Sequence, residues 1–283
     1  MPGKVYLVGA GPGDPELLTL KALRVLKSAD VVLHDALIGT EVLQYIPRRA
    51  KVQDVGKRCG QKSVPQPEIN RLLVNYARLD LQVVRLKGGD PLIFGRSGEE
   101  IEALRQANID FEIVPGITAA LASAAAANFP LTHREVSSAT IFLTSHRSKS
   151  SPRSKSHADE SWPAELPSNA TVVVYMPGRD YARTAEKLRQ SGVKGATPCV
   201  VISQAASQNE RVYKTTVDAL PAAPQLPAPS LLVVGEVTRL AEHASLRPSA
   251  FAVSEEVSAL FAQLGDLSGD FASRHFVDQE QPE

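Results

Sequence analysis

The 283-residue chain has little of what marks secreted, membrane-spanning or nucleic-acid-binding proteins. Its two cysteines, Cys59 and Cys199, are too few for a disulfide framework or a four-thiolate zinc site. Its 31 basic and 31 acidic residues cancel, so no overall positive field favours a nucleic acid or a membrane surface as partner. The longest run of small apolar residues, 117–127, is shorter than the roughly 18 residues of a membrane-spanning helix. We therefore expect a soluble, cytoplasmic protein that binds neither nucleic acid nor membranes.

Several catalytic patterns are also missing. No group of histidine, cysteine and aspartate residues has the spacing of a metal site, so no metal is predicted. The sequence contains neither a Gly-x-Ser-x-Gly nucleophile turn nor a Gly-Lys-Ser/Thr phosphate loop. The chemistry must therefore be sought in other loops.

The order of apolar patterns predicts an α/β fold. Leucines recur at spacings of three and four over residues 16–27, which predicts an amphipathic helix there. Short apolar runs before and after it predict strands at residues 5–8, 31–33, 52–55, 82–86 and 111–114. Strands that alternate with helices favour a largely parallel sheet, and their continuous apolar runs indicate that both faces of the sheet are covered.

The pattern changes near Pro130, where we place a boundary between a first α/β domain of residues 1–130 and a second of 131–244. The second domain is expected to contain a helix at 181–190 and strands at 140–144, 171–175, 199–203, 211–217 and 231–234. Serine-rich residues near 147–168 are predicted to form a flexible insertion. Residues 245–283 carry seven acidic residues and two arginines, a net of about −5, and are predicted to be a largely disordered tail.

Three glycine-containing loops follow predicted strands of the first domain, at residues 9–15, 88–91 and 115–120. Open α/β sheets bind ligands at the carboxyl ends of their strands, so these loops together predict one composite pocket. The first loop resembles a dinucleotide fingerprint, but Asp14 stands where the third glycine is needed and Pro12 lacks a backbone donor. A cofactor other than a nicotinamide is therefore favoured, and a purely structural turn is the alternative.

Two ionisable residues also follow strands of this domain. Asp35 comes directly after residues 31–34, and Lys57 lies after the next strand. A carboxylate and an ammonium group in one cleft can act as general base and general acid. The alternative is that Asp35 and Lys57 are loop residues whose charges are exposed to solvent and take no part in catalysis.

These motifs, in this order, resemble the tetrapyrrole methylase superfamily, and within it the family of uroporphyrinogen-III C-methyltransferases. The matching stretches are residues 8–22, 85–100, 115–120 and 130–134, with weaker matches at 174–176 and 229–237. The run from Arg-Leu-Lys-Gly-Gly-Asp-Pro at 85 to Gly-Glu-Glu at 100 is the most specific of them.

The resemblance implies two α/β domains with S-adenosylmethionine in the cleft between them, in a homodimer. It implies that Asp35 is the proton acceptor, Lys57 the proton donor and Arg134 a ligand of a substrate carboxylate. The cofactor-binding positions that it implies are Pro12, Gly88, Gly89, Asp90, Ile93, Thr118, Ala119, Met176 and Ala205. The implied reaction methylates carbons 2 and 7 of uroporphyrinogen III to give precorrin-2, which feeds sirohaem or cobalamin synthesis.

The eight carboxylates of that substrate need cations, and we expect a rim drawn from Lys57, Arg58, Lys62, Arg85, Lys87, Arg96, His133 and Arg134, with plain solvent exposure as the alternative. The sequence departs from the family pattern at five positions: His34, Ala36, Ser145, Pro177 and Ala205. Tyrosine and arginine usually flank the Asp35 position, and glycine is usual at the last three.

Three other functions compete with this interpretation. The first is a methylase of a later corrin precursor, against which residues 85–100 argue. The second is a nicotinamide-dependent oxidoreductase that uses the loop at Gly9. The third is a sensor that binds cofactor or tetrapyrrole without turnover.

Overall fold

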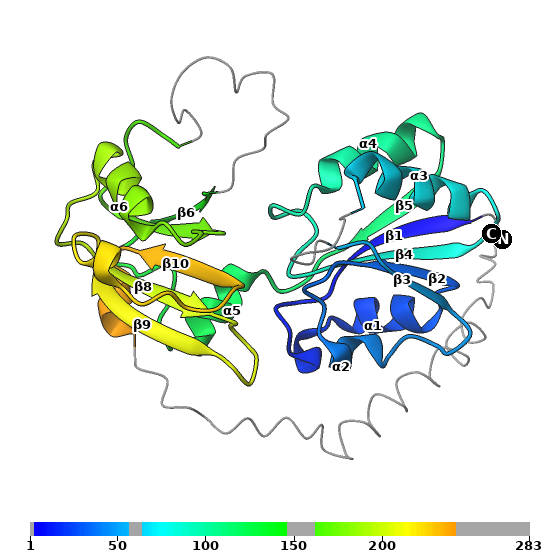
Figure 1. Cartoon of the computed structure of the whole chain (residues 1–283), viewed down its shortest axis with the longest axis horizontal. Helices are drawn as coiled ribbons and strands as arrows, with labels where there is room; N and C mark the ends of the chain where they lie inside the picture. Colours follow the sequence, from blue (N-terminus) through cyan, green and yellow to red (C-terminus); the bar gives the residue numbers. More distant parts are fainter. Residues whose placement is uncertain (1–2, 57–63, 146–161, 242–283) are drawn as a thin grey trace, which may run out of the picture. The chain divides into compact units, whose positions relative to one another are not determined.

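A parallel five-stranded sheet forms the first part of the chain. The computed structural model describes residues 3–56, 64–145 and 162–241 (Figure 1). The strands are β1 (Lys4–Gly9), β2 (Val31–His34), β3 (Lys51–Asp54), β4 (Gln82–Lys87) and β5 (Asp110–Val114). They lie in the order β3-β2-β4-β1-β5, and all four neighbouring pairs are parallel. The prediction of a largely parallel sheet is confirmed.

Helices cover both faces of this sheet. Helices α1 (Leu20–Lys27) and α2 (Thr40–Leu43) lie on one face, and α3 (Gln66–Ala77) and α4 (Ser97–Gln106) lie on the other (Figure 1). Neighbouring residues of β1 point to opposite sides, since Leu7 packs in the core under α3 and α4 whereas Val8 packs in the core under α1. This explains why the strands read as continuous apolar runs.

The helix expected over residues 16–27 begins later than predicted. A short 3-10 helix, η1 (Pro15–Leu17), comes first, Leu18 is extended, and α1 starts after Thr19. Side chains cause the interruption, because Asp14 accepts a hydrogen bond from the Glu16 amide at 2.8 Å and Thr19 accepts one from the Ala22 amide at 3.1 Å. Each side chain therefore caps a separate helical segment.

A second, mixed sheet follows. Its strands are β6 (Ala139–Thr144), β7 (Ala170–Tyr175), β8 (Pro198–Ser203), β9 (Arg211–Thr216) and β10 (Ser230–Val234), in the order β6-β7-β10-β8-β9. Only β6 and β7 are parallel among these pairs. Helix α6 (Tyr181–Gln190) packs in one core of this sheet and α5 (Ala119–Ala126) in the other, while η3 (Leu220–Ala222) and η4 (Glu236–Leu240) are short 3-10 turns. The predicted α/β class with two sheets is confirmed.

Two packing features bear on the expected domain plan. Helix α5 precedes Pro130, yet its buried alanines pack with Val173 and Val233 of the second sheet. Within the segment predicted to be a flexible insertion, Trp162 and Leu166 are buried in the core beside α6, whereas the residues between and after them are exposed. Residues 147–161 and 245–283 lie outside the described residues, and the boundary near Pro130 stays a prediction.

Two further findings bear on the expected chemistry. Cys199 is buried in β8, and burial raises the pKa of its thiol to about 12, so this cysteine is a packing residue. In the described part of the chain, every helix is too short or too polar to cross a membrane.

Candidate active site

The three glycine loops of the first sheet meet directly beyond neighbouring strands. Gly11 and Gly89 exchange two backbone hydrogen bonds, of 2.7 and 3.2 Å. A Cβ atom on Gly116 would lie 2.4 Å from the Gly89 carbonyl oxygen, which no real side chain tolerates. The glycines at these positions therefore let the loops pack on one another. Gly88 differs, because an added Cβ would meet only Leu37 at an ordinary 3.7 Å, so its backbone is open to a ligand.

Asp90 joins two of these loops through its carboxylate. Its Oδ2 accepts a hydrogen bond from the Gly116 amide at 3.0 Å, and its Oδ1 accepts one from the Leu92 amide at 2.8 Å. Each carboxylate oxygen retains a second lone pair for a ligand hydroxyl or ammonium group. Asp90 thus fixes the position of the loop at Gly116 relative to its own loop.

A tyrosine of the second sheet contacts the loop that follows β5. The Tyr175 hydroxyl lies 2.6 Å from Thr118 Oγ1 and accepts a hydrogen bond from the Ala120 amide at 3.2 Å, at the start of α5. The Phe94 ring packs against the Tyr175 ring with centroids 4.9 Å apart. Burial raises the pKa of Tyr175, so its hydroxyl keeps its proton and Thr118 is held in place by a neutral group.

Asp35 belongs to a buried network of charges rather than to a solvated loop. Its carboxylate forms an ion pair with the Arg85 guanidinium, and Arg85 Nε donates to Glu100 Oε1 at 3.0 Å. Lys87 Nζ also contacts Glu100, at 2.9 Å from Oε2. Arg85, Lys87 and Glu100 are each at most 3% exposed, whereas the Asp35 side chain is 31% exposed. Asp35 is therefore the one member of this network that a substrate can reach.

The charges in this network are set by burial and by their neighbours. Burial disfavours the Arg85 cation, but the carboxylates of Asp35 and Glu100 outweigh that effect and raise the pKa of Arg85. Burial and the Arg85 charge lower the pKa of Lys87, and the attraction of Glu100 opposes this only in part. Arg85 thus stays charged and orients the Asp35 carboxylate.

The model of the family described as Tetrapyrrole (Corrin/Porphyrin) Methylases matches residues 4–221. The chain belongs to this family. It is 47% identical over 239 residues to the "Siroheme synthase" of Actinobacillus succinogenes, an alignment that covers 84% of this chain and 49% of the relative. It is 44% identical over 247 residues to the "Uroporphyrinogen-III C-methyltransferase" of Paracoccus denitrificans, covering 86% of this chain and 84% of the relative. The chain thus spans about half the length of the siroheme synthases it matches.

A solved structure supports the same family. The uroporphyrin-III C-methyltransferase of Thermus thermophilus, complexed with S-adenyl homocysteine, superposes with a TM-score of 0.67 at 36% sequence identity. That match covers 84% of this chain and all of the other chain. The fold expected from the sequence is therefore that of known tetrapyrrole methylases.

The structure brings several predicted cofactor positions together. Gly89 lies beside Thr118 and Ala119, because an added Cβ would approach within 3.9 Å of the Thr118 Cα and 3.7 Å of the Ala119 amide nitrogen. Ile93, Ala119 and Ala205 pack in one apolar cluster with Tyr175. Pro12 lies between Gly11 and Gly13 in the first loop, and Met176 follows Tyr175 with its side chain exposed.

Other predicted residues are placed differently. Lys57, Arg58 and Lys62 lie outside the described residues. Arg134 is exposed in the turn that His133 and Ser137 close by backbone hydrogen bonds. The prediction that Arg85 and Lys87 belong to a substrate-facing rim is wrong, because both side chains point under α4 and pair with Glu100. Arg96 pairs with Glu99 on the surface.

The loop at Gly9 does not favour a nicotinamide cofactor. It leads into the three-residue helix η1 and not into a long helix whose amide groups could face a pyrophosphate. Among the described residues, no three histidine, cysteine, aspartate or glutamate side chains form a group that could hold a metal ion.

Sequence reasoning missed Tyr175 and Glu100 as parts of the site. Tyr175 is the last residue of a predicted strand and directly precedes Met176, a predicted cofactor position. That place in the sequence could have indicated that Tyr175 belongs to the site. Glu100 lies in a helix of mixed charge, where nothing in the sequence separates a buried glutamate from its exposed neighbour Glu99.

Proposed function

We propose that this protein transfers methyl groups from S-adenosylmethionine to carbons 2 and 7 of uroporphyrinogen III, giving precorrin-2 for sirohaem or cobalamin synthesis. The observation that carries the proposal is the position of one accessible carboxylate, Asp35, held by a buried arginine beyond the same sheet edge as the glycine loops. The names of the relatives and of the Thermus structure support the same substrate class.

The described residues fit S-adenosylmethionine, which supplies a methyl group on a sulfonium centre. The open backbone at Gly88 and the free lone pairs of Asp90 suit the ribose hydroxyls or the ammonium group. Ile93, Ala119 and Ala205 give an apolar surface of the kind that suits the adenosine, and Met176 is exposed beside Tyr175. Pro12, Gly89 and Thr118 complete the positions that we assign to this co-substrate.

The chain's own residues supply proton transfer and charge. Attack by a pyrrole carbon leaves positive charge and an excess proton on the ring. Asp35 stabilises that charge and accepts the proton, while Arg85 keeps the carboxylate oriented. We assign Lys57 as proton donor and Arg134 as the ligand of a substrate carboxylate.

The direct test is anaerobic incubation of the purified protein with S-adenosylmethionine and uroporphyrinogen III, followed by mass spectrometry of the tetrapyrrole. A gain of two methyl groups is expected. An unmodified tetrapyrrole, with S-adenosylmethionine still bound by calorimetry, would overturn the proposed substrate and point to a later corrin precursor.

Replacing Asp90 with alanine should raise the Kd for S-adenosylmethionine more than tenfold. The substitution removes the charged acceptor that we assign to the co-substrate, and hydrogen bonds to charged groups contribute about 1.5–3 kcal/mol. It also removes the acceptor of two loop amides, which holds the loops in position. Isothermal calorimetry measures the change, and Asp110→Ala, at an exposed carboxylate, is the control. An unchanged Kd for Asp90→Ala would remove Asp90 from the binding site.

We also propose a cytoplasmic homodimer, on the family resemblance and the low cysteine content. With a chain of 30.4 kDa, the dimer has a mass of twice that value, or 60.8 kDa. Light scattering after size-exclusion chromatography measures it, and a mass near 30.4 kDa at micromolar concentration would contradict the dimer.

A further inference from the structure

Tyr175, the last residue of β7, contacts segments that carry proposed co-substrate positions. Its hydroxyl bonds to Thr118 Oγ1 and to the Ala120 amide, which lie after β5. Its ring packs against Phe94, in the loop after β4, and its own chain continues into Met176. One residue thus joins three segments in which we place S-adenosylmethionine positions.

The start of α5 is capped by this tyrosine and not by the helix's own N-cap residue. Thr118 occupies the N-cap position with the extended backbone that the position requires, at φ −68° and ψ 148°. No amide of the described helix donates to the Thr118 hydroxyl, whereas the Tyr175 hydroxyl accepts a hydrogen bond from the Ala120 amide at 3.2 Å. The tyrosine therefore replaces the usual cap, and the Thr118 hydroxyl is left for another contact.

The surroundings decide which of the two hydroxyl groups donates to the other. Their oxygens lie 2.6 Å apart, and the Tyr175 oxygen already accepts the Ala120 amide. Tyr175 is 8% exposed, and burial raises its pKa, so the phenol keeps its proton and needs an acceptor for it. Within the described residues, Thr118 Oγ1 is the one acceptor in reach of that proton. Tyr175 is therefore the donor, and the proton of the partly exposed Thr118 hydroxyl remains available for a ligand.

Aromatic packing holds the Tyr175 ring independently of its hydroxyl. The ring centroid lies 4.9 Å from that of Phe94 and 5.7 Å from that of Phe142, on β6. Both arrangements are tilted or edge-on, the geometry that aromatic pairs prefer. A phenylalanine at position 175 keeps these two contacts, so its effects report on the hydroxyl alone.

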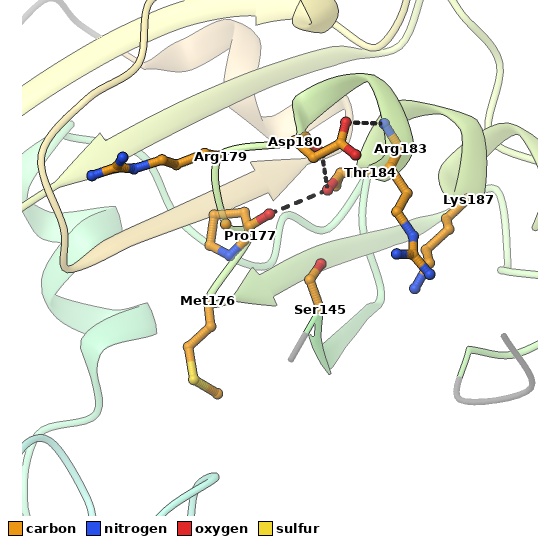
Figure 2. A pocket seen from close by; sticks show the side chains of 9 residues that line it. Ser145, Met176, Pro177, Arg179, Asp180, Arg183, Thr184 and Lys187 are labelled. Atoms are coloured by element: carbon orange, nitrogen blue, oxygen red, sulfur yellow. Dashed lines mark hydrogen bonds between the residues drawn. The ribbon is translucent and has the colours of Figure 1, made fainter. Parts of the chain in front are cut away.

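The backbone of Tyr175 also fixes the start of the next loop. Its carbonyl oxygen accepts a hydrogen bond from the Ser145 amide at 3.1 Å. Met176 then turns with a left-handed φ of +50°, and its side chain extends away from α6 (Figure 2). Non-glycine residues in this conformation are strained and cluster at ligand sites. The end of β7 thus sets the direction of Met176 as well as the position of Thr118.

We propose that Tyr175 is a positioning residue for S-adenosylmethionine: its phenol donates to Thr118, so that the Thr118 hydroxyl can donate to an acceptor atom of the co-substrate. The proposal rests on the proposed function, because Thr118 is a position that we assign to this co-substrate. Tyr175 acts through Thr118 and touches no reacting atom. Its contribution is therefore equal in the ground state and the transition state, so its loss should raise KM for S-adenosylmethionine and leave kcat within twofold of wild type.

The test is a double-mutant cycle of Tyr175→Phe and Thr118→Val, each of which removes one hydroxyl at nearly constant shape. Each single variant should raise the Kd for S-adenosylmethionine about fivefold, within the roughly 2- to 10-fold that one neutral hydrogen bond contributes. Tyr175→Phe should change that Kd less than twofold when residue 118 is already valine, because the two hydroxyl groups act as one unit. A tyrosine that only caps α5 would give equal fold-changes in both backgrounds.

Tyr181→Phe is the matched control, because Tyr181 is also buried and its hydroxyl bonds to the Leu226 backbone. It should lower the midpoint of thermal unfolding and leave the Kd for S-adenosylmethionine unchanged. Thr118→Ser keeps the hydroxyl and should bind within about twofold of wild type. The serine and valine variants test the inference even if Tyr175→Phe does not fold, since an unchanged Kd in Thr118→Val would overturn it.

The outcomes separate this inference from the proposed function. A wild type that methylates uroporphyrinogen III, with an unchanged Kd in folded Tyr175→Phe or with equal changes in both backgrounds, would overturn the role of Tyr175 alone. The expected cycle without methylation of uroporphyrinogen III would support that role and overturn the proposed substrate. A wild type that binds no S-adenosylmethionine would overturn both.

Discussion

Replacing Asp35 with asparagine should lower kcat for methyl transfer to uroporphyrinogen III by about 10²- to 10⁴-fold, the usual contribution of a positioned proton acceptor. Asparagine has the same shape and can still accept a hydrogen bond from Arg85 through its amide oxygen, so the local geometry survives. It cannot accept the proton that leaves the ring. The loss of activity should therefore fall on kcat, while the Kd for S-adenosylmethionine changes little. The midpoint of thermal unfolding should also fall, because Arg85 is buried and loses a charged partner, but by less than in Glu100→Gln because Asp35 is 31% exposed.

Glu41→Gln is the matched control for this substitution, because Glu41 is an exposed carboxylate of the neighbouring helix α2. Its kcat should equal that of the wild type. Single-turnover assays with pre-bound S-adenosylmethionine separate the chemical step from product release. Retention of more than a tenth of wild-type kcat in Asp35→Asn would show that another group accepts the proton.

Most of the fold could be predicted because the central strands of both sheets are buried and rich in β-branched residues. Residues 31–33 and 171–175, for example, carry no polar interruption that would suggest a loop. The start of α1 could not be placed, since leucine spacing continues through residues 17 and 18 while the side chains of Asp14 and Thr19 divide the segment. The packing of Trp162 was missed because its surroundings are serine-rich and only the tertiary structure covers its ring.

The part of the site that lies at the carboxyl ends of the strands could be predicted from the sequence. Asp35, Gly88 and Asp90 follow strands, and parallel topology alone brings such residues to one edge. The roles of Arg85 and Lys87 were not predictable in this way. Their two-residue spacing places both on one face of β4, but the sequence does not say that a helix with a buried glutamate covers that face. The charge partners of Asp35 therefore emerge only from the tertiary structure.

The second large effect concerns this buried glutamate. Replacing Glu100 with glutamine should lower the free energy of unfolding by about 3–5 kcal/mol, because it leaves two buried cations without their shared carboxylate. Glu100 is fully buried and also accepts a hydrogen bond from Gln66 Nε2 at 3.1 Å. Urea unfolding followed by circular dichroism measures the change. Glu99→Gln, one residue away on the exposed side of α4, removes only a surface pair with Arg96 and should cost at most about 1 kcal/mol.

The pH dependence of stability, which Lys87 contributes to, gives a second test of the same buried network. Its pKa in the folded protein lies below the ordinary value of 10.5, so protonation disfavours the fold, and stability rises with pH between the folded pKa and 10.5. Without the Glu100 charge the folded pKa falls further, and the rise should begin at lower pH in Glu100→Gln than in the wild type. Adding Lys87→Met to Glu100→Gln removes the titrating cation, so it should abolish that difference and restore part of the lost stability. In the urea experiment, Glu99→Gln and Glu100→Gln could instead lower the free energy of unfolding by equal, small amounts. That result would contradict a buried charge network that holds Arg85 and orients Asp35.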